Sequence, residues 1–267
     1  MKILVAGDTH GQLKLFADLV NNSDCDCALQ CGDFGVWNTI DFMRWGYVVD
    51  KHGHYDVYDT MAPFTDVING DLKFTKPVYF ITGNHENFDY RDSIDWEKVR
   101  KENNIHWIKD EWNMVIFNDD VSIAGLNGCY SYKIFIGQKQ KIRSKVKVLP
   151  ETPPVIEAYL QRVLGKDPRG RFKYRDTEAL KKIKADILIL HEVPMGVIEK
   201  TELPIENVVG CSPINEIIES MQPKYVFCGH FHMKKESMIG NSKIVVLPKI
   251  ENGYCILDTE TMKIEWK

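Results

Sequence analysis

No stretch of the 267-residue sequence approaches the roughly 20 consecutive apolar residues that a membrane-spanning helix needs. The apolar run near the start, residues 2–6, is too short for a signal peptide, and acidic and histidine residues follow it directly. The seven cysteines are odd in number and include no pair of Cys-x-x-Cys elements, which disfavours a disulfide framework or a structural zinc site. We therefore predict a cytoplasmic protein with no membrane partner and with reduced thiols, most of them in strands.

The sequence also lacks internal repeats and low-complexity linkers, so we predict a single domain over residues 1–267. Hydrophobic residues make up 44% and charged residues 27%, as is typical of globular proteins. No pattern indicates an oligomeric state.

Charge is distributed unevenly along the chain. The net charge is −4, yet residues 131–184 hold 15 Lys and Arg against 5 Asp and Glu, a local balance of +10 that leaves −14 elsewhere. This basic stretch favours either an anion-binding surface or a solvated helical face. Residues 137–175, which are rich in Lys, Arg, Pro and Gly, are predicted to form a basic insertion.

Short apolar runs alternate with segments of helical spacing, which indicates an α/β protein. We predict strands at residues 2–6, 26–31, 77–82, 186–190 and 224–228, and helices at 12–22, 40–50, 153–164, 176–184 and 212–221. Short runs at 237–239, 243–247, 254–258 and 263–266, separated by turns, predict a C-terminal β-meander. Metal-capable residues follow five of the strands, where α/β sheets gather ligand-binding loops.

Five clusters carry these residues: Gly7-Asp8-Thr9-His10-Gly11, Gly32-Asp33-Phe34-Gly35, Gly83-Asn84-His85-Glu86, His191, and Gly229-His230-Phe231-His232. Taken singly, each has an ordinary explanation as a turn, a helix N-cap or a solvated strand pair. Together, in this order and each at a strand end, they indicate a divalent metal centre. Mixed Asp, Asn and His donors suit manganese, iron or zinc. The neighbouring glycines allow sharp turns and leave room for a phosphate to approach.

The motif set resembles that of the calcineurin-like metallophosphoesterase superfamily, and it spans residues 7–232. The resemblance implies a four-layer αββα sandwich and a site for two divalent metal ions. One ion would be held by Asp8, His10, Asp33 and His232, and the other by Asp33, Asn84, His191 and His230, with Asp33 as the bridge. His85 would be the general acid, and Glu86 either supports the site or simply begins a helix. Two adjacent cations lower the pKa of a shared water, so that a bridging hydroxide forms near neutral pH and attacks the phosphate.

Finer likenesses distinguish between substrate classes. The Ser/Thr protein phosphatases continue the second motif with Val-Asp-Arg-Gly, whereas this sequence reads Gly32-Asp33-Phe34-Gly35 and lacks that Arg. The turn at 125–128, the Tyr174-Arg175 pair and His191-Glu192-Val193-Pro194 are similar to RNA lariat debranching enzymes, which cut 2′,5′-phosphodiester bonds. Those enzymes carry Cys at the position of Asp8.

We therefore favour a phosphodiesterase acting on RNA, other nucleic acid or nucleotides. Tyr130 could stack on a base and Lys133 could bind a phosphate, although packing of the tyrosine is the simpler interpretation. The alternatives are a phosphomonoesterase like the protein phosphatases and a metal-stabilised scaffold without turnover.

Overall fold

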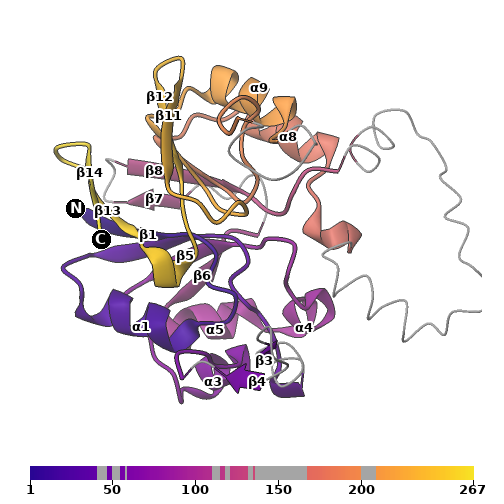
Figure 1. Ribbon diagram of the computed structural model, residues 1–267, viewed down its shortest axis with the longest axis vertical. Coiled ribbons are helices and arrows are strands. Elements are labelled where there is room, and N and C mark those ends of the chain that lie inside the picture. Colours follow the sequence, from indigo (N-terminus) through magenta and orange to yellow (C-terminus); the bar gives the residue numbers. More distant parts are fainter. Residues whose placement is uncertain are drawn as a thin grey trace, which may run out of the picture.

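Two β-sheets lie face to face, with helices covering their outer surfaces (Figure 1). The computed structural model describes residues 1–40, 47–49, 55–57, 59–109, 115–117, 121–131, 135, 167–199 and 209–267. Among the helices in these residues, none combines the length and hydrophobicity required to cross a membrane.

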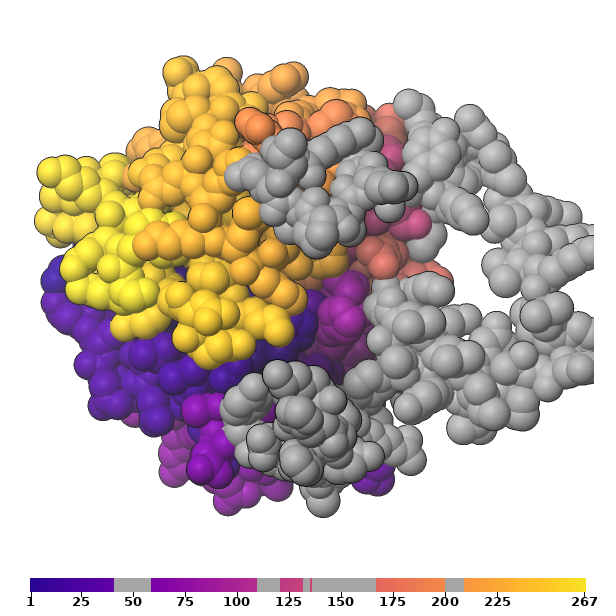
Figure 2. Space-filling view, in the orientation of Figure 1, coloured from indigo at the N-terminus to yellow at the C-terminus, as the bar shows by residue number. Residues whose placement is uncertain are grey.

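The first sheet has the order β14-β13-β1-β2-β5-β6. The strands β1 (Lys2–Ala6), β2 (Cys27–Cys31), β5 (Val78–Ile81) and β6 (Ile105–Trp107) pair in parallel. The hairpin of β13 (Cys255–Asp258) and β14 (Lys263–Trp266) adds to β1 in antiparallel register. Both ends of the described chain therefore belong to one sheet, and Figure 2 shows the yellow C-terminal residues lying against the indigo N-terminal ones.

The second sheet has the order β11-β12-β10-β9-β8-β7. Its central strands β8 (Val121–Leu126), β9 (Ile187–Leu190), β10 (Tyr225–Cys228) and β12 (Ser242–Val246) pair in parallel. The edge strands β7 (Val115–Phe117) and β11 (Lys235–Ile239) are antiparallel to their neighbours. A separate pair, β3 (Tyr47–Val49) and β4 (Tyr55–Val57), forms a small antiparallel sheet.

Side-chain alternation explains the layers. In β1, Ile3 and Val5 enter the core between the two sheets, while Leu4 and Ala6 face the helices. On that outer face lie α1 (Leu13–Asn22), α3 (Phe64–Asn69) and α5 (Trp96–Asn103), with α4 (Phe88–Ser93) nearby. On the second sheet, α8 (Tyr174–Leu180) and α9 (Ser212–Met221) cover the outer face. The predicted four-layer αββα class is confirmed.

Most strand and helix predictions agree with the structure, and two were wrong. The predicted helix at 40–50 is incorrect at Tyr47–Val49, which pairs with β4 as a strand, as its Tyr-Val-Val composition favours. The C-terminal β-meander was also wrong. A loop that includes the 3₁₀ helix η3 (Ile250–Asn252) carries the chain from the second sheet to the first, so the four strands form two separate hairpins.

The predicted helix at 153–164 and most of the predicted insertion at 137–175 fall outside the described residues. The single-domain organisation stays a prediction.

Candidate metal centre

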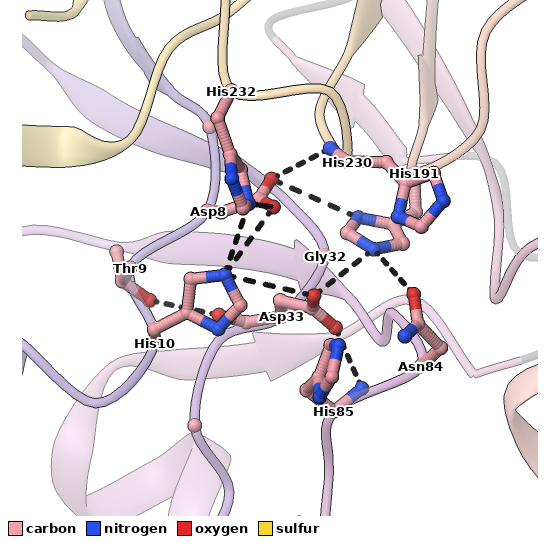
Figure 3. Close-up of polar contacts among 12 residues, drawn as sticks. Asp8, Thr9, His10, Gly32, Asp33, Asn84, His85, His191, His230 and His232 are labelled. Atoms are coloured by element: carbon pink, nitrogen blue, oxygen red, sulfur yellow. Dashed lines mark hydrogen bonds and ion pairs between the residues drawn. The ribbon is translucent and has the colours of Figure 1, made fainter. Parts of the chain in front are cut away.

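The five predicted clusters meet at one end of the two sheets (Figure 3). Those following β1, β2 and β5 come from the first sheet, and those following β9 and β10 come from the second. Parallel pairing within each sheet places these carboxyl ends side by side. The backbone N–H of His230 donates to Asp8 Oδ1 at 2.8 Å, which joins the two sheets at the site.

A first group of donors consists of Asp8, His10 and His232. Asp8 Oδ2 lies 2.7 Å from His232 Nε2 and 3.6 Å from His10 Nε2, and the two imidazole nitrogens are 3.1 Å apart. Asp33 Oδ2 lies 3.9 Å from His10 Nε2. The four side chains predicted to hold one metal are therefore gathered around a common point.

A second group lies on the other side of Asp33. His191 Nε2 is 3.2 Å from Asp33 Oδ2 and 3.2 Å from Asn84 Oδ1. His191 Nδ1 donates to the Cys31 carbonyl at 2.9 Å, which orients the ring with Nε2 toward these oxygens. The ring of His230 lies 4.9 Å from that of His191, measured between centroids. Asp33 thus lies between the two predicted donor groups.

The buried carboxylates fit a cation. Among the described residues, Asp8 Oδ2 and Asp33 Oδ2 are the buried side-chain oxygens that accept no well-oriented hydrogen bond, although imidazole nitrogens lie nearby. Burial opposes ionisation of Asp33, but the charge of His191 outweighs it and holds the pKa of Asp33 well below its usual value. In the same pair, burial acts against the charge of His191, yet Asp33 raises the pKa of His191 well above 6.5. The raised pKa of His191 reflects the two buried carboxylates of Asp33 and Asp8, whose negative charge favours a positive charge beside them.

Several of these residues adopt unusual backbone conformations. His10, Asp33, His230 and His232 have φ values of 45°, 53°, 70° and 52°. The left-handed region is unfavourable for residues with a side chain, and such strain concentrates at functional sites. The unfavourable conformation therefore occurs at four of the residues whose side chains are candidate metal donors.

Glycines beside the donors make room for other donors. A Cβ on Gly83 would lie 2.1 Å from Asp33 Oδ1, and one on Gly229 would lie 2.3 Å from Asp8 Oδ1. These glycines are therefore required by the packing of the site itself. Room for an incoming phosphate, the role expected from the sequence, stays a prediction.

His85 lies beside both Asp33 and His10. Its backbone N–H donates to Asp33 Oδ1 at 2.8 Å, and its ring is 5.6 Å from that of His10, edge to face. The indole of Trp37 donates to the His85 carbonyl at 2.7 Å, which fixes the backbone. Burial lowers the pKa of His85, so its ring is mostly neutral at pH 7.

Glu86 supports the loop that carries Asp33. Its Oε1 accepts the N–H of Phe34 at 2.7 Å, and its Oε2 accepts those of Gly35 and Val36 at 3.0 and 2.7 Å. Burial and the nearby charge of Asp33 raise the pKa of Glu86, although the three donors act in the opposite direction. Of the two interpretations open from the sequence, these contacts favour support of the site over a helix start.

One residue beside the donor groups was missed from the sequence. Cys129 Sγ lies 2.9 Å from Asn84 Oδ1 and 3.6 Å from His230 Nδ1, and it forms a group of candidate donors with His191 and His230. It follows the end of β8, as the other clusters follow their strands, and this position was the available signal. All seven cysteines are free and buried, four of them in strands.

The predicted substrate residues are less well placed. The ring of Tyr130 packs against Phe135 and Phe172, with centroids at 5.5 and 5.8 Å. Lys133 lies outside the described residues. Their contribution to binding stays a prediction.

The sequence model of the calcineurin-like phosphoesterases matches residues 1–234. The chain belongs to this family. Phosphoesterases of this family use divalent metals, and the structure contains groups of side chains that could hold such ions.

Curated relatives of this phosphoesterase include lariat debranching enzymes. That of Drosophila melanogaster is 26% identical over 258 residues, covering 90% of this chain and 44% of the relative. That of Arabidopsis thaliana is 25% identical over 262 residues, covering 88% and 55%. The chain thus spans about half the length of these relatives. An uncharacterized protein of Haemophilus influenzae is 27% identical over 200 residues, covering 68% of this chain and 80% of the relative.

Solved structures share the fold of the phosphoesterase. A protein of Thermus thermophilus superimposes with a TM-score of 0.58 at 16% identity, covering all of this chain and 97% of the other. Phosphopantetheinyl hydrolase of Mycobacterium tuberculosis gives a TM-score of 0.50 at 11% identity, covering 94% and 90%.

Proposed function

We propose that this phosphoesterase holds two divalent metal ions and hydrolyses phosphodiester bonds in nucleic acid or nucleotides. The observation that carries the proposal is the pair of donor groups on either side of Asp33, a buried carboxylate with an oxygen that accepts no well-oriented hydrogen bond. One donor group, of Asp8, His10 and His232, would hold the first ion with Asp33. The other, of Asn84, His191 and His230, would hold the second with the same carboxylate.

The donor chemistry fits manganese, iron or zinc, because carboxylate, amide and imidazole donors are combined. When bound, the two cations would polarise the phosphoryl oxygens and lower the pKa of a water between them. Repulsion between two cations would require an anion between them, and Asp33, whose Oδ2 lies 3.9 Å from His10 Nε2 and 3.2 Å from His191 Nε2, would supply it.

His85 is the proposed proton donor. Its ring is mostly neutral before substrate arrives, because burial lowers its pKa. A bound phosphate group would raise that pKa by placing negative charge beside the ring. The imidazole could then donate a hydrogen bond to the phosphate and pass a proton to the leaving oxygen.

A diester substrate is supported by the similarity to lariat debranching enzymes and by the +10 balance of residues 131–184. Each Lys or Arg that displaces a counterion from a polyanion adds affinity. The missing Arg of the protein phosphatase motif argues against a phosphomonoesterase of that type.

The test compares bis-p-nitrophenyl phosphate with p-nitrophenyl phosphate, using protein stripped of metal and then supplied with manganese, iron(II) or zinc. Faster diester turnover supports the proposal. Faster monoester turnover would favour the phosphatase-like alternative, and no turnover with any metal would favour the scaffold.

Two variants examine the roles of the residues. His85→Ala should reduce turnover roughly 10²- to 10⁴-fold with the metal content unchanged. His106→Ala is the matched control, because that imidazole stacks on Tyr79 in the first sheet, away from the donor groups. Asp33→Asn should lose both metals, and retention of two equivalents would exclude a bridging role.

A further inference from the structure

The backbone of Cys129 is held on both sides. The Cys129 N–H donates to the Gly170 carbonyl at 2.9 Å, and the Cys129 carbonyl accepts the N–H of Phe172 at 3.2 Å. The residue is fully buried. Because both sides of the residue are held, the fold sets the direction of its Cα–Cβ bond.

The Cys129 side chain is directed at a donor group. Its Sγ lies 2.9 Å from Asn84 Oδ1 and 3.6 Å from His230 Nδ1. The ligand atoms of Cys129, His191 and His230 all lie within 4.8 Å of one another. In the part of the chain that the structure describes, none of the other six cysteines belongs to such a group.

These separations match those of donors sharing one metal. With a zinc–sulfur distance of about 2.3 Å and a zinc–nitrogen distance of about 2.05 Å, the two donors lie about 3.1 Å apart at a right angle and about 3.6 Å apart when the angle is near 110°. At a right angle, sulfur and an oxygen at about 2.0 Å lie about 3.0 Å apart. The 3.6 and 2.9 Å observed for Cys129 agree with both values.

A second observation points to a cation at the same place. Asp33 Oδ2, a buried oxygen without a well-oriented hydrogen bond, lies 3.2 Å from His191 Nε2. His191 belongs both to the group of Cys129 and His230 and to the group of Asp8 and Asp33, so its imidazole links the sulfur donor to this buried oxygen.

We propose that Cys129 is a sulfur ligand of the metal held by Asn84, His191 and His230, so that this position binds zinc or iron in preference to manganese. The inference rests on the proposed dinuclear site and specifies its chemistry. On binding, the S–H bond breaks, the proton passes to solvent and the thiolate bonds to the metal, with no change of oxidation state. Thiolate donors favour zinc and iron over the harder manganese ion.

The test is X-ray absorption at the zinc edge on the full chain loaded with two equivalents of zinc. The wild type should show sulfur scattering at about 2.3 Å beside nitrogen and oxygen at about 2.0–2.1 Å. Cys129→Ser should lose the sulfur shell, while Cys25→Ser, whose thiol lies beside the end of α1, should keep it. The cobalt(II) form should show a thiolate-to-metal charge-transfer band in the wild type and not in Cys129→Ser.

Affinity gives a second readout. Cys129→Ser should weaken zinc binding at one site by at least the roughly 10- to 100-fold that loss of an outer-shell partner costs, and should affect manganese less. Two bound zinc ions without sulfur scattering would overturn the ligand assignment and leave the proposed function standing. Failure to bind zinc, iron(II) or manganese would overturn both. The presence or absence of sulfur scattering in the wild type alone tests the ligand assignment, even if Cys129→Ser does not fold.

Discussion

Replacing Glu86 by Gln should loosen the loop that carries Asp33. The carboxylate accepts three backbone N–H groups while it is 3% exposed. The amide of Gln has one acceptor oxygen, which can keep the pair of bonds from Gly35 and Val36. Its NH₂ group would then face the buried N–H of Phe34, which is left without a partner.

The structure sets the size of the effect. Loss of one charge-assisted bond costs roughly 1.5–3 kcal/mol, and the two remaining bonds weaken when their acceptor becomes neutral. Removing the charge also relieves repulsion with Asp33, which is part of the reason that the pKa of Glu86 is raised. A net loss of about 2–3 kcal/mol in the free energy of unfolding follows.

Urea unfolding of the metal-free protein measures this loss without a contribution from metal binding. Glu97→Gln is the control, because that carboxylate is exposed and pairs with Arg100 on the surface of α5, so its urea midpoint should not change. Metal content measured in parallel should fall only for Glu86→Gln. An unchanged midpoint and full metal content in Glu86→Gln would refute the supporting role.

Three further outcomes are expected. Gly83→Ala should lose metal, because the new Cβ would overlap Asp33 Oδ1. Gly240→Ala, whose Cβ would meet nothing within 4 Å, should keep its metal and lose only about 1 kcal/mol in the free energy of unfolding because of its positive φ. Metal analysis and urea unfolding measure the two effects. Zinc affinity should fall with decreasing pH, because the raised pKa of His191 keeps a proton on the metal-free protein that zinc must displace. Calorimetry in buffers of different ionisation enthalpy would detect the released proton. In the metal-free protein, the contribution of His191 to the free energy of unfolding is fully present below its unfolded pKa of about 6.5 and is lost as pH rises through its folded pKa. Metal-free Asp33→Asn should therefore show a weaker dependence of stability on pH.

Strand ends could be located from the sequence because buried parallel strands are continuous apolar runs and the polar donors follow them directly. The range of α9 agrees with its prediction at both ends, since Ser212-Pro213 begins the helix and its apolar spacing continues to Met221. The two C-terminal hairpins could not be distinguished from a meander, because strand period does not reveal which sheet a strand joins.

The donor set was recognisable because it lies in motifs. Cys129 could not be recognised as a candidate metal donor from the sequence, because a buried cysteine ordinarily behaves as a small apolar residue. Only its tertiary contacts with Asn84 and His230 indicate that it could be a ligand. The support from Glu86 likewise depends on a contact between residues about 50 positions apart.

Because the donors are divided between two sheets, the core between the sheets also affects the geometry of the site. Side chains such as Val5, Ile189 and Phe227 fill the space between the sheets, and so they set how far the carboxylates of one sheet stand from the imidazoles of the other. A core substitution such as Phe227→Leu would reduce the side-chain volume between the two sheets and let them approach each other. If the proposed metal pair is bound there, we expect such a core substitution to change the distance between donors of the two sheets, and with it the metal preference, while every donor is retained.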